Sequence, residues 1–341
     1  MPQPVTLKEL AQLLNLAPST VSKALKGHKD ISETTKKKVR ELADQIHYQP
    51  NALAKSLRNR QSHSLAVILP TLKEYFFIQL LRGILEFAYH KRYKLIVYET
   101  GEQYEKEAEI CYSLIKSGLD GLLIAPTYNT IDTQHFKSLI EGNLPLVFLG
   151  RTVGNIKADR VLEDDFQGAW LAVNHMIKSG CKRIAHFSAP QQWLWAQKRQ
   201  LGYLQSLRDH HFPINRNLIV ENYPPDQIIS LIKNLIQHFH IDGIFAINDR
   251  VAIKIMLILQ KLGYIVPQDI AICGFGNDPS SQFTSPELTT VENKGLEIGR
   301  IATELLINRI EKKIERETLT KILPHQIIIR QSTGKTKNTE E

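Results

Sequence analysis

The stretch LAPSTVSKALKG near the N-terminus carries small hydroxyl side chains and two lysines at helical spacing. Ser19, Thr20 and Ser22 can donate and accept hydrogen bonds, and Lys23 and Lys26 supply positive charge. Side chains of these types on one short helix can contact DNA phosphates and base edges. A buried helix whose polar residues only cap and solubilise it is the alternative. The elements around the stretch decide between the two.

Motifs for catalysis or metal binding are incomplete in the rest of the chain. STGKT at Ser332 resembles the end of a phosphate-binding loop, but Ile329 stands where that loop needs glycine. GFG at Gly274 lacks the third glycine of a dinucleotide fingerprint. His238 and His240 have no further ligand nearby in the sequence, so we expect a solvated pair rather than a metal site. With no nucleophile and base at recognisable spacing, we expect neither an enzyme nor a cofactor.

The segment around the first stretch predicts three short helices over residues 6–46. Thr6 and Glu9 have the spacing of a capping box at the start of the first helix. Pro18 suits the first position of the second helix, which should end at Gly27. A third helix follows Ser32, and Val39, Leu42, Ala43 and Ile46 lie on one side of it.

Charge is concentrated in the same segment. Residues 1–60 hold 8 Lys and 3 Arg against 3 Glu and 2 Asp, so they carry +6 of the net +8. A basic segment before a nearly neutral body favours nucleic-acid binding, with a solvated lysine-rich face as the alternative. Three distant cysteines argue against a disulfide framework or zinc cluster and suit a reducing cytosol. We find neither a secretory signal nor a membrane span in the sequence.

From Leu65 onward, short apolar runs alternate with amphipathic stretches. LAVILP, KLIVYE, GLLIAP and LPLVFLG form one set, and RIAHFSA, NLIVEN, GIFAIND and IAICGFG form a second. Continuous apolar strands that alternate with helices indicate parallel sheets covered on both faces. Two similar lobes would place a ligand in the cleft between them, outside the carboxyl ends of the strands. HQIIIR predicts a last strand, and we expect the polar tail from Gln331 to be disordered.

These motifs together resemble the LacI/GalR family of bacterial regulators. The headpiece motifs are VTLKELAQLLNLAPSTVSKALKG, ISETTKKKV and YQPNALAKSL. The core motifs are LPLVFLGR, VLEDDFQGA, RQLGY, IND, GFGND and PELTTV, in that order. The resemblance implies a small all-α helix-turn-helix headpiece and an α/β core of two parallel-sheet lobes, similar to a periplasmic binding protein.

The resemblance implies that the helix from about Pro18 to Lys26 enters the major groove. Its predicted base contacts are Pro18, Ser19 and Lys23, with Val21, Ala24 and Leu25 as core. The predicted contacts closer to phosphates are Thr20, Ser22, Lys26, Thr6, Ser32 and Thr35. The family commonly has Ser where Ala17 stands, and alanine cannot cap this helix through its side chain. Backbone N–H groups at the helix start can still hold a phosphate.

A second DNA element is expected from Asn51 to Asn59. In the family, two such hinge helices pair over the minor groove, and the residue that matches Leu57 wedges between base steps. Ala54 would let the backbone approach the groove, while packing of Leu57 against the core is the alternative. The paired hinge implies a homodimer on a pseudo-palindromic double-stranded operator, with a tetramer left open.

The resemblance also implies a set of effector-binding residues in the cleft. These are Phe76, Phe77, Arg151, Trp193, Arg199, Tyr223, Asn248 and Asn277. Arg199 would hold ligand oxygens with its guanidinium fork, and Asn248 would bond a hydroxyl through its amide. Trp193 and Tyr223 have lobe core as their alternative. Many sugar-responsive members carry Asp where Gly276 stands, so the ligand class stays open.

We expect a headpiece at residues 1–50, a hinge helix and linker at 51–63, a core at 64–330 and a polar tail at 331–341. The first lobe is expected at about 64–160 and 290–320, and the second at about 161–289 and 321–330. The predicted function is that of a sequence-specific transcriptional regulator, a repressor in the bacterial cytoplasm at the nucleoid. Its effector would be a small molecule such as a sugar or sugar derivative, and it would have no membrane partner. A periplasmic-type solute receptor is the alternative.

Overall fold

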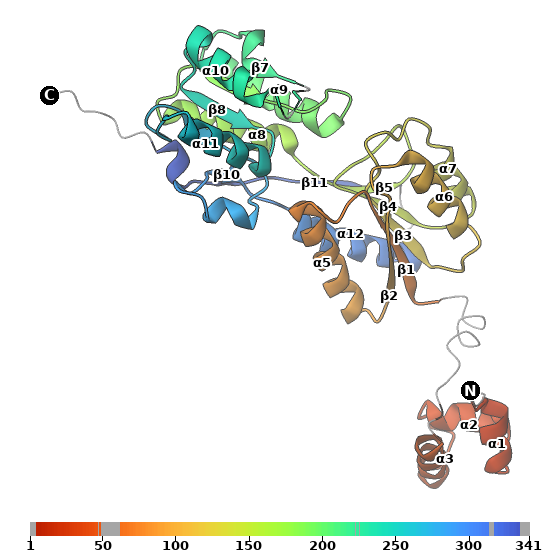
Figure 1. Cartoon of the computed structure of the whole chain (residues 1–341). Helices are drawn as coiled ribbons and strands as arrows, with labels where there is room; N and C mark the ends of the chain where they lie inside the picture. Colours follow the sequence, from red (N-terminus) through yellow and green to blue (C-terminus); the bar gives the residue numbers. More distant parts are fainter. Residues whose placement is uncertain are drawn as a thin grey trace. The chain divides into compact units, whose positions relative to one another are not determined.

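The computed structural model describes residues 5–46, 48, 62–221, 223–224, 226–313 and 317–334. The chain divides into two compact units, Met1–His63 and Ser64–Glu341, and each is described by itself. Figure 1 follows the course of the chain through both units. Within the described residues, no helix is long and apolar enough to cross a membrane.

The first unit contains the three predicted helices. They are α1 Leu7–Leu13, α2 Pro18–Leu25 and α3 Glu33–Gln45. The Thr6 hydroxyl accepts from the Glu9 N–H, and the Glu9 carboxylate accepts from the Thr6 N–H, which completes the predicted capping box. Leu10, Val21 and Val39, one from each helix, are fully buried and meet in a small core. Their packing fixes which face of α2 stays accessible.

The first lobe of the second unit is a parallel sheet covered by helices on both faces. In spatial order its strands are β11 Thr320–Leu323, β5 Asp159–Glu163, β4 Leu146–Leu149, β3 Gly121–Ile124, β1 Ser64–Leu69 and β2 Lys94–Glu99. Helices α5 Tyr75–His90 and α12 Gly295–Ile310 cover one face, and α6 Tyr104–Leu114 and α7 Gln134–Glu141 cover the other. Apolar side chains on both faces of the strands bury two separate cores.

The second lobe repeats this plan with four parallel strands. In spatial order they are β7 Ile219–Val220, β6 Ile184–Phe187, β8 Gly243–Ala246 and β9 Ala271–Cys273. Helices α8 Asp165–Lys178 and α9 Leu194–Asp209 cover one face, and α10 Ile228–Phe239 and α11 Asp249–Lys261 cover the other. A two-stranded antiparallel sheet joins β10 Thr290–Val291 to β12 Ile327–Ile328. The short 3-10 turns are η1 Arg216–Leu218, η2 Pro279–Gln282 and η3 Gln331–Thr333.

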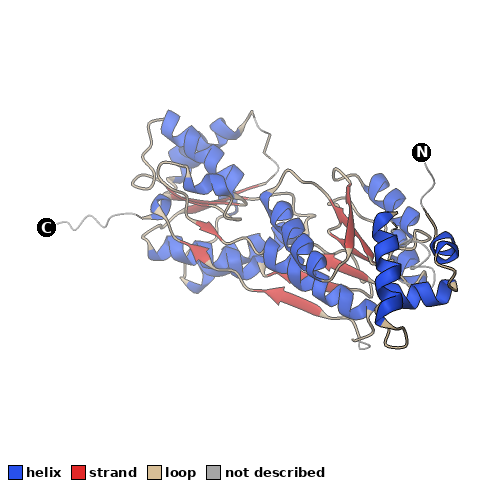
Figure 2. Ribbon diagram, turned by 90° about the horizontal axis from the view of Figure 1, so that it is seen from below, coloured by secondary structure: helices blue, strands red, loops and turns tan. Residues whose placement is uncertain are grey.

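The chain passes between the lobes three times. It crosses from β5 to α8, from β10 to α12, and from β11 to β12. Figure 2 shows helices around the strands of both lobes. In the first lobe, α5 and α12 cross closely, and glycine at position 299 permits this approach. A Cβ atom on Gly299 would lie only 2.2 Å from the Leu80 carbonyl oxygen. The first lobe is therefore completed by chain that follows the second lobe in sequence.

The predicted α/β lobes are confirmed, with three differences of detail. Strands β5 and β11 were not predicted, since DRVLE and TKIL contain charged residues that break the apolar run. The expected lobe boundary after residue 320 falls inside β11, which belongs to the first sheet. The tail is ordered at its start, because Ser332 and Thr333 are fully buried. The Ser332 hydroxyl donates to the Ile272 carbonyl at 2.6 Å and accepts from the Thr289 N–H.

Candidate functional site

Helix α2 presents its polar residues outward. Pro18, Ser19 and Lys23 are exposed, whereas Val21 and Ala24 are fully buried, as predicted for a helix with one face in the core. Of the other predicted contacts on or next to this helix, Thr20 and Ser22 are half-buried and Lys26 is exposed. Leu25, predicted as core, is half-buried and packs against the headpiece core.

The start of α2 has no side-chain cap, which agrees with the expectation for Ala17. The first N–H groups of a helix carry partial positive charge and can bind an anion, so they can meet a DNA phosphate. Thr6 caps α1 in the capping box described above. Ser32 caps α3 by accepting from the Thr35 N–H, and the Ser32 and Thr35 hydroxyls lie 2.9 Å apart. Thr6 and Ser32, two of the predicted phosphate contacts, are thus also helix caps.

Lys23 has a partner that sequence reasoning missed. Its Nζ atom lies 3.4 Å from a carboxylate oxygen of Asp30, and both side chains are at least half exposed. An exposed pair of this kind is weak and is screened by salt. Lys23 can therefore exchange Asp30 for a DNA acceptor at little cost. Asn51, Ala54 and Leu57, the three hinge residues predicted to contact DNA, lie outside the described residues.

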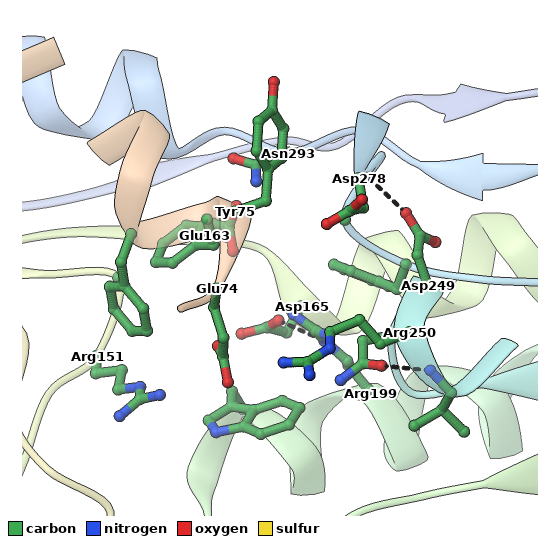
Figure 3. A pocket seen from close by; sticks show the side chains of 18 of the residues that line it. Glu74, Tyr75, Arg151, Glu163, Asp165, Arg199, Asp249, Arg250, Asp278 and Asn293 are labelled. Atoms are coloured by element: carbon green, nitrogen blue, oxygen red, sulfur yellow. Dashed lines mark hydrogen bonds and ion pairs between the residues drawn. The ribbon is translucent and has the colours of Figure 1, made fainter. Parts of the chain in front are cut away.

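A cavity of about 430 Å³ lies between the two lobes. Its volume is in the range of small-molecule sites. First-lobe residues that line it follow β1, β3 and β4. Second-lobe residues come from the starts of α8, α9, α10 and α11 and from the segments that follow β7 and β9. Figure 3 shows Glu74 pointing into the cavity, with Arg151 on one side of it and Asp165 and Arg199 on the other. The predicted cleft is thus present at the expected ends of the strands.

Arg199 is the most firmly held of the predicted cleft residues. Its Nε donates to Asp165 Oδ1 at 2.8 Å, and a terminal nitrogen donates to the Ile247 carbonyl at 2.7 Å. Its guanidinium carbon lies 3.5 Å from the centre of the Phe275 ring. Neither bond uses its second terminal nitrogen, which leaves donors for a ligand in a fixed direction.

Arg151 is held by a matching set of contacts in the first lobe. One terminal nitrogen donates to both carboxylate oxygens of Glu102 at 2.9 and 3.2 Å and to the Pro126 carbonyl. The guanidinium carbon lies 3.7 Å from the centre of the Tyr128 ring. Glu102 also accepts from the Tyr128 N–H at 3.0 Å. One carboxylate therefore orients both the cation and the loop that carries the aromatic ring.

Asn248 can offer a ligand only one of the two polar atoms of its side-chain amide. Its side-chain oxygen accepts from the Val251 N–H and caps α11, which leaves only the amide nitrogen for a ligand. Asp249 next to it is buried and accepts from the Thr290 hydroxyl and the Asp278 N–H. Burial raises the pKa of Asp249 to about 6. Gly276 lines the cavity without supplying a carboxylate there.

A buried acid cluster borders the cavity. Atoms of Glu163, Asp165 and His325 lie within 4.8 Å of one another, a donor set that is able to hold a cation. The Arg199 guanidinium already supplies positive charge to Asp165 there. Burial, reinforced by Asp165, raises the pKa of Glu163 to about 8, and burial lowers the pKa of His325 to about 4. Burial therefore favours the neutral forms of Glu163 and His325.

Most of the predicted effector residues border the main cavity. Those that line it are Phe76, Phe77, Arg151, Arg199, Tyr223 and Asn248. Phe77 is almost fully buried and also packs in the first-lobe core. Trp193 instead lines an adjoining cavity of about 270 Å³, called the side cavity below. Asn277 lines neither cavity, and its side-chain oxygen accepts from Arg330 at 2.7 Å, which favours a structural role.

Sequence reasoning missed several residues that line the main cavity. They are Glu74, Tyr75, Tyr128, Asp165, Trp195, Arg250 and Phe275. A signal was present for Trp195, which is the second tryptophan of the same WLW stretch as Trp193. Asp165 follows the VLED run directly and is the first residue of α8. Tyr128 carried no signal, because its partners come from distant segments.

Comparisons with known proteins agree with this architecture. Residues 6–51 match the model for bacterial regulatory proteins of the lacI family, and residues 173–333 match a periplasmic binding protein-like domain. A transcriptional repressor named PurR from Vibrio atlanticus is 27% identical over 337 residues, 98% of this chain and 99% of its own length. A ribose operon repressor from Halalkalibacterium halodurans is 28% identical over 337 residues, with the same coverage.

The fold comparison gives the same result. A solved structure of the lac repressor dimer bound to operator and the anti-inducer ONPF aligns with a TM-score of 0.82 at 21% identity, over 97% of this chain and 99% of that one. A helix-turn-helix unit joined to a two-lobed core with a cleft defines a DNA-binding regulator controlled by a small-molecule effector. The chain belongs to the LacI/GalR family of transcriptional regulators.

Proposed function

We propose that the chain is a homodimeric repressor that binds a pseudo-palindromic operator and is controlled by a sugar or sugar derivative in the cleft. The observation that carries the proposal is the main cavity, where aromatic rings and guanidinium donors from both lobes converge. A ligand that touches both lobes binds one degree of closure better than another. It therefore shifts the balance between lobe arrangements by its difference in affinity.

The lining supports a polyhydroxylated ligand. Phe76, Tyr128 and Trp195 contribute aromatic surface to the lining, while Arg199 and the Asn248 amide nitrogen offer directed donors. Glu74 supplies an acceptor that points into the cavity. This combination of flat apolar surface and a few convergent polar groups suits a saccharide ring. The name of the ribose operon repressor among the relatives favours the same class.

Dimerisation is supported by an exposed apolar face on the first lobe. Leu85 and Tyr89 on α5 are 49% and 79% exposed, and Ile96 and Val97 on the neighbouring edge strand β2 are 42% and 40% exposed. An apolar patch next to a strand edge that pairs with no other strand among the described residues is typical of a protein interaction site. A second copy related by a two-fold axis would cover it and match the symmetry of the operator.

The DNA part of the proposal assigns base contacts to Pro18, Ser19 and Lys23 and the minor-groove wedge to Leu57. Effector-dependent closure would change the spacing of the two hinge segments in the dimer, so that Leu57 enters or leaves the groove. The proposed place of action is the bacterial cytoplasm, where the operator DNA is. Binding rather than catalysis is the proposed activity.

An anisotropy titration of the full chain on its own upstream DNA tests the regulator. We expect specific binding that weakens steeply with salt, since phosphate contacts dominate affinity. Salt-insensitive binding without sequence preference would favour a solute receptor or an unrelated role. Leu57→Ala should reduce specific affinity much more than nonspecific affinity, and equal losses on both DNAs would contradict the wedge.

A thermal-shift screen of sugars, sugar phosphates and nucleosides tests the effector. A compound that binds only the native core raises its melting temperature. Stabilisation by saccharides, followed by a change in operator affinity with the same compound, is the expected result. Stabilisation by nucleosides alone would overturn the carbohydrate assignment and leave the regulator intact.

A further inference from the structure

Five side chains form a continuous stack across the cleft, called the column below. The Arg151 guanidinium lies over Tyr128, and the Tyr128 ring stacks on Trp193 with centroids 3.9 Å apart at 18°. Trp193 stacks on Trp195 at 5.8 Å, and the Arg199 guanidinium carbon lies 4.8 Å from the centre of the Trp195 ring. The guanidinium at each end is attracted to the neighbouring ring through the ring quadrupole, and the three rings between them stack on one another.

The column joins the two lobes where Tyr128 meets two tryptophan rings. Tyr128 and Arg151 follow β3 and β4 of the first lobe, whereas Trp193, Trp195 and Arg199 lie at the start of α9 in the second. The close stack between the lobes is Tyr128 on Trp193, and Tyr128 also lies 6.1 Å from Trp195 in a tilted arrangement. Trp193 lines the side cavity but not the main one, so its position is explained by this contact rather than by the main cavity.

Each half of the column is anchored within its own lobe. On the first-lobe side, Glu102 accepts from Arg151 and from the Tyr128 N–H. The neighbouring Thr127 N–H donates to the buried Glu107 carboxylate at 2.7 Å. On the second-lobe side, Arg199 is fixed by Asp165 and Ile247, as described above. The two halves are preorganised, so opening the cleft breaks the central stack and leaves each half in place.

The closed column also has a cost. The indole Nε1 atoms of Trp193 and Trp195 are both buried, and neither has a hydrogen-bond partner among the described residues. A buried donor without an acceptor is unfavourable relative to a hydrated one. Separation of the rings would expose these N–H groups to water. Stacking therefore favours closure, and the sealed donors oppose it.

We propose that Tyr128 and Trp193 are positioning residues that hold the two lobes together and set the closure on which DNA binding depends. The proposal rests on the regulatory function proposed above. In it, the main cavity selects the effector, and the column sets how much of the chain is closed before an effector arrives. A small shift in this balance is enough to change the response to an effector.

Tryptophan fluorescence tests, without any ligand, whether Tyr128 and Trp193 hold the two lobes together. The chain has three tryptophans, and Trp170 contacts Asp209 rather than the column. In a Trp170→Phe background only Trp193 and Trp195 emit. Tyr128→Ala should increase acrylamide quenching and lower the closed-to-open ratio by about two- to tenfold, as the loss of one aromatic pair predicts. Tyr128→Phe keeps the ring and should leave quenching unchanged.

Ile131→Ala provides a matched control in the same loop. Ile131 is 93% exposed and takes no part in the column, so its removal should not change quenching. Trp193→Ala and the double variant with Tyr128→Ala complete a cycle followed by thermal unfolding. If the two residues act through one contact, the double variant should be about as stable as the less stable of the two single variants. Additive losses, or unchanged quenching in Tyr128→Ala, would overturn the proposal.

Operator binding of the full chain tests whether the closure set by Tyr128 and Trp193 controls DNA binding. Tyr128→Ala should change affinity for the upstream DNA, in either direction, by about two- to tenfold, because the change cannot exceed the shift in closure. Tyr128→Phe and Ile131→Ala should bind as the unsubstituted chain does. Increased quenching with unchanged DNA affinity would overturn the regulatory role. If the unsubstituted chain has no sequence-specific DNA binding, the proposed function itself fails, whatever the quenching shows.

Discussion

The DNA-facing surface of α2 and the cleft between the lobes are built in opposite ways. On α2, one eight-residue helix presents polar side chains that are exposed and only weakly paired, such as Lys23. In the cleft, the polar side chains come from distant segments and are mutually paired and nearly buried, such as Arg199 with Asp165. Residues of the first surface can change with little effect on folding, while residues of the second also support the fold. Four substitutions test this difference.

The largest effect is expected for Arg199→Ala. The change leaves the Asp165 carboxylate buried without its cation, and loss of one partner of a buried pair costs about 3–5 kcal/mol. Urea unfolding of the core should show this loss, together with a lost effector response. Arg199→Lys keeps the charge and should recover part of the stability. A loss below about 1 kcal/mol would mean that the cleft is as loosely paired as the α2 surface.

Glu163→Gln should change how core stability depends on pH. Because the pKa of Glu163 is raised to about 8, its protonated form favours the folded state, and that contribution is lost as pH rises from about 4.5 through 8. Glutamine resembles the protonated acid, so the variant should gain on the order of 2 kcal/mol relative to the unsubstituted chain above pH 8. Chemical unfolding at pH 5, 7 and 9 measures this. If the free energy of unfolding varies with pH in the same way in both proteins, Glu163 is ionised in the folded state and the prediction is wrong.

Lys23→Ala should separate function from stability. We expect a loss of about 1–3 kcal/mol in operator affinity and relaxed preference at one base position, since Lys23 is a predicted base contact. Headpiece stability should change by less than about 0.5 kcal/mol, because the Asp30 pair is exposed. Lys37→Ala on α3, also exposed, is the control for loss of charge alone. Equal effects of the two substitutions would remove Lys23 from the base contacts.

The smallest effect is expected for Ala17→Ser. Serine can supply the missing cap of α2, which should stabilise the headpiece by about 0.5–1 kcal/mol. Thermal unfolding of the headpiece, followed by circular dichroism, measures the gain. Thr6→Ala is the reverse case, because it removes an existing cap and should cost about 1 kcal/mol. If serine brings no gain, backbone contacts already satisfy this helix start.

The same difference explains what the sequence allowed us to predict. The headpiece helices depend on local signals, such as the Thr6–Glu9 spacing and Pro18, and these are confirmed. The apolar runs predict eight strands, and most of these runs are buried on both faces; the edge strand β2 is an exception, since Ile96 and Val97 are exposed. Strand β5 escapes prediction since DRVLE contains charges that are satisfied only by distant partners, such as Arg309 on Asp159.

The cleft is only partly predictable for the same physical reason. Arg199 and Asn248 were found through their resemblance to family motifs. Tyr128 was missed because its role depends on contacts with Arg151 and Trp193, which are 23 and 65 positions away in the chain. Asn277 matches a family position, yet its side chain is engaged by Arg330. Which of several polar residues faces a ligand depends on pairings that one sequence does not reveal.

The three passages between the lobes determine the order in which the two lobes are completed during synthesis. The ribosome makes five strands of the first lobe, then the whole sheet of the second, and only afterwards α12 and β11. Until then, one face of the first sheet lacks α12 and the edge of β5 has no partner. At about 5–20 residues per second, the stretch from Glu163 to Leu323 takes about 10–30 s to synthesise. During that interval the second lobe can fold first, and the nascent first lobe is the part that a chaperone would have to shield.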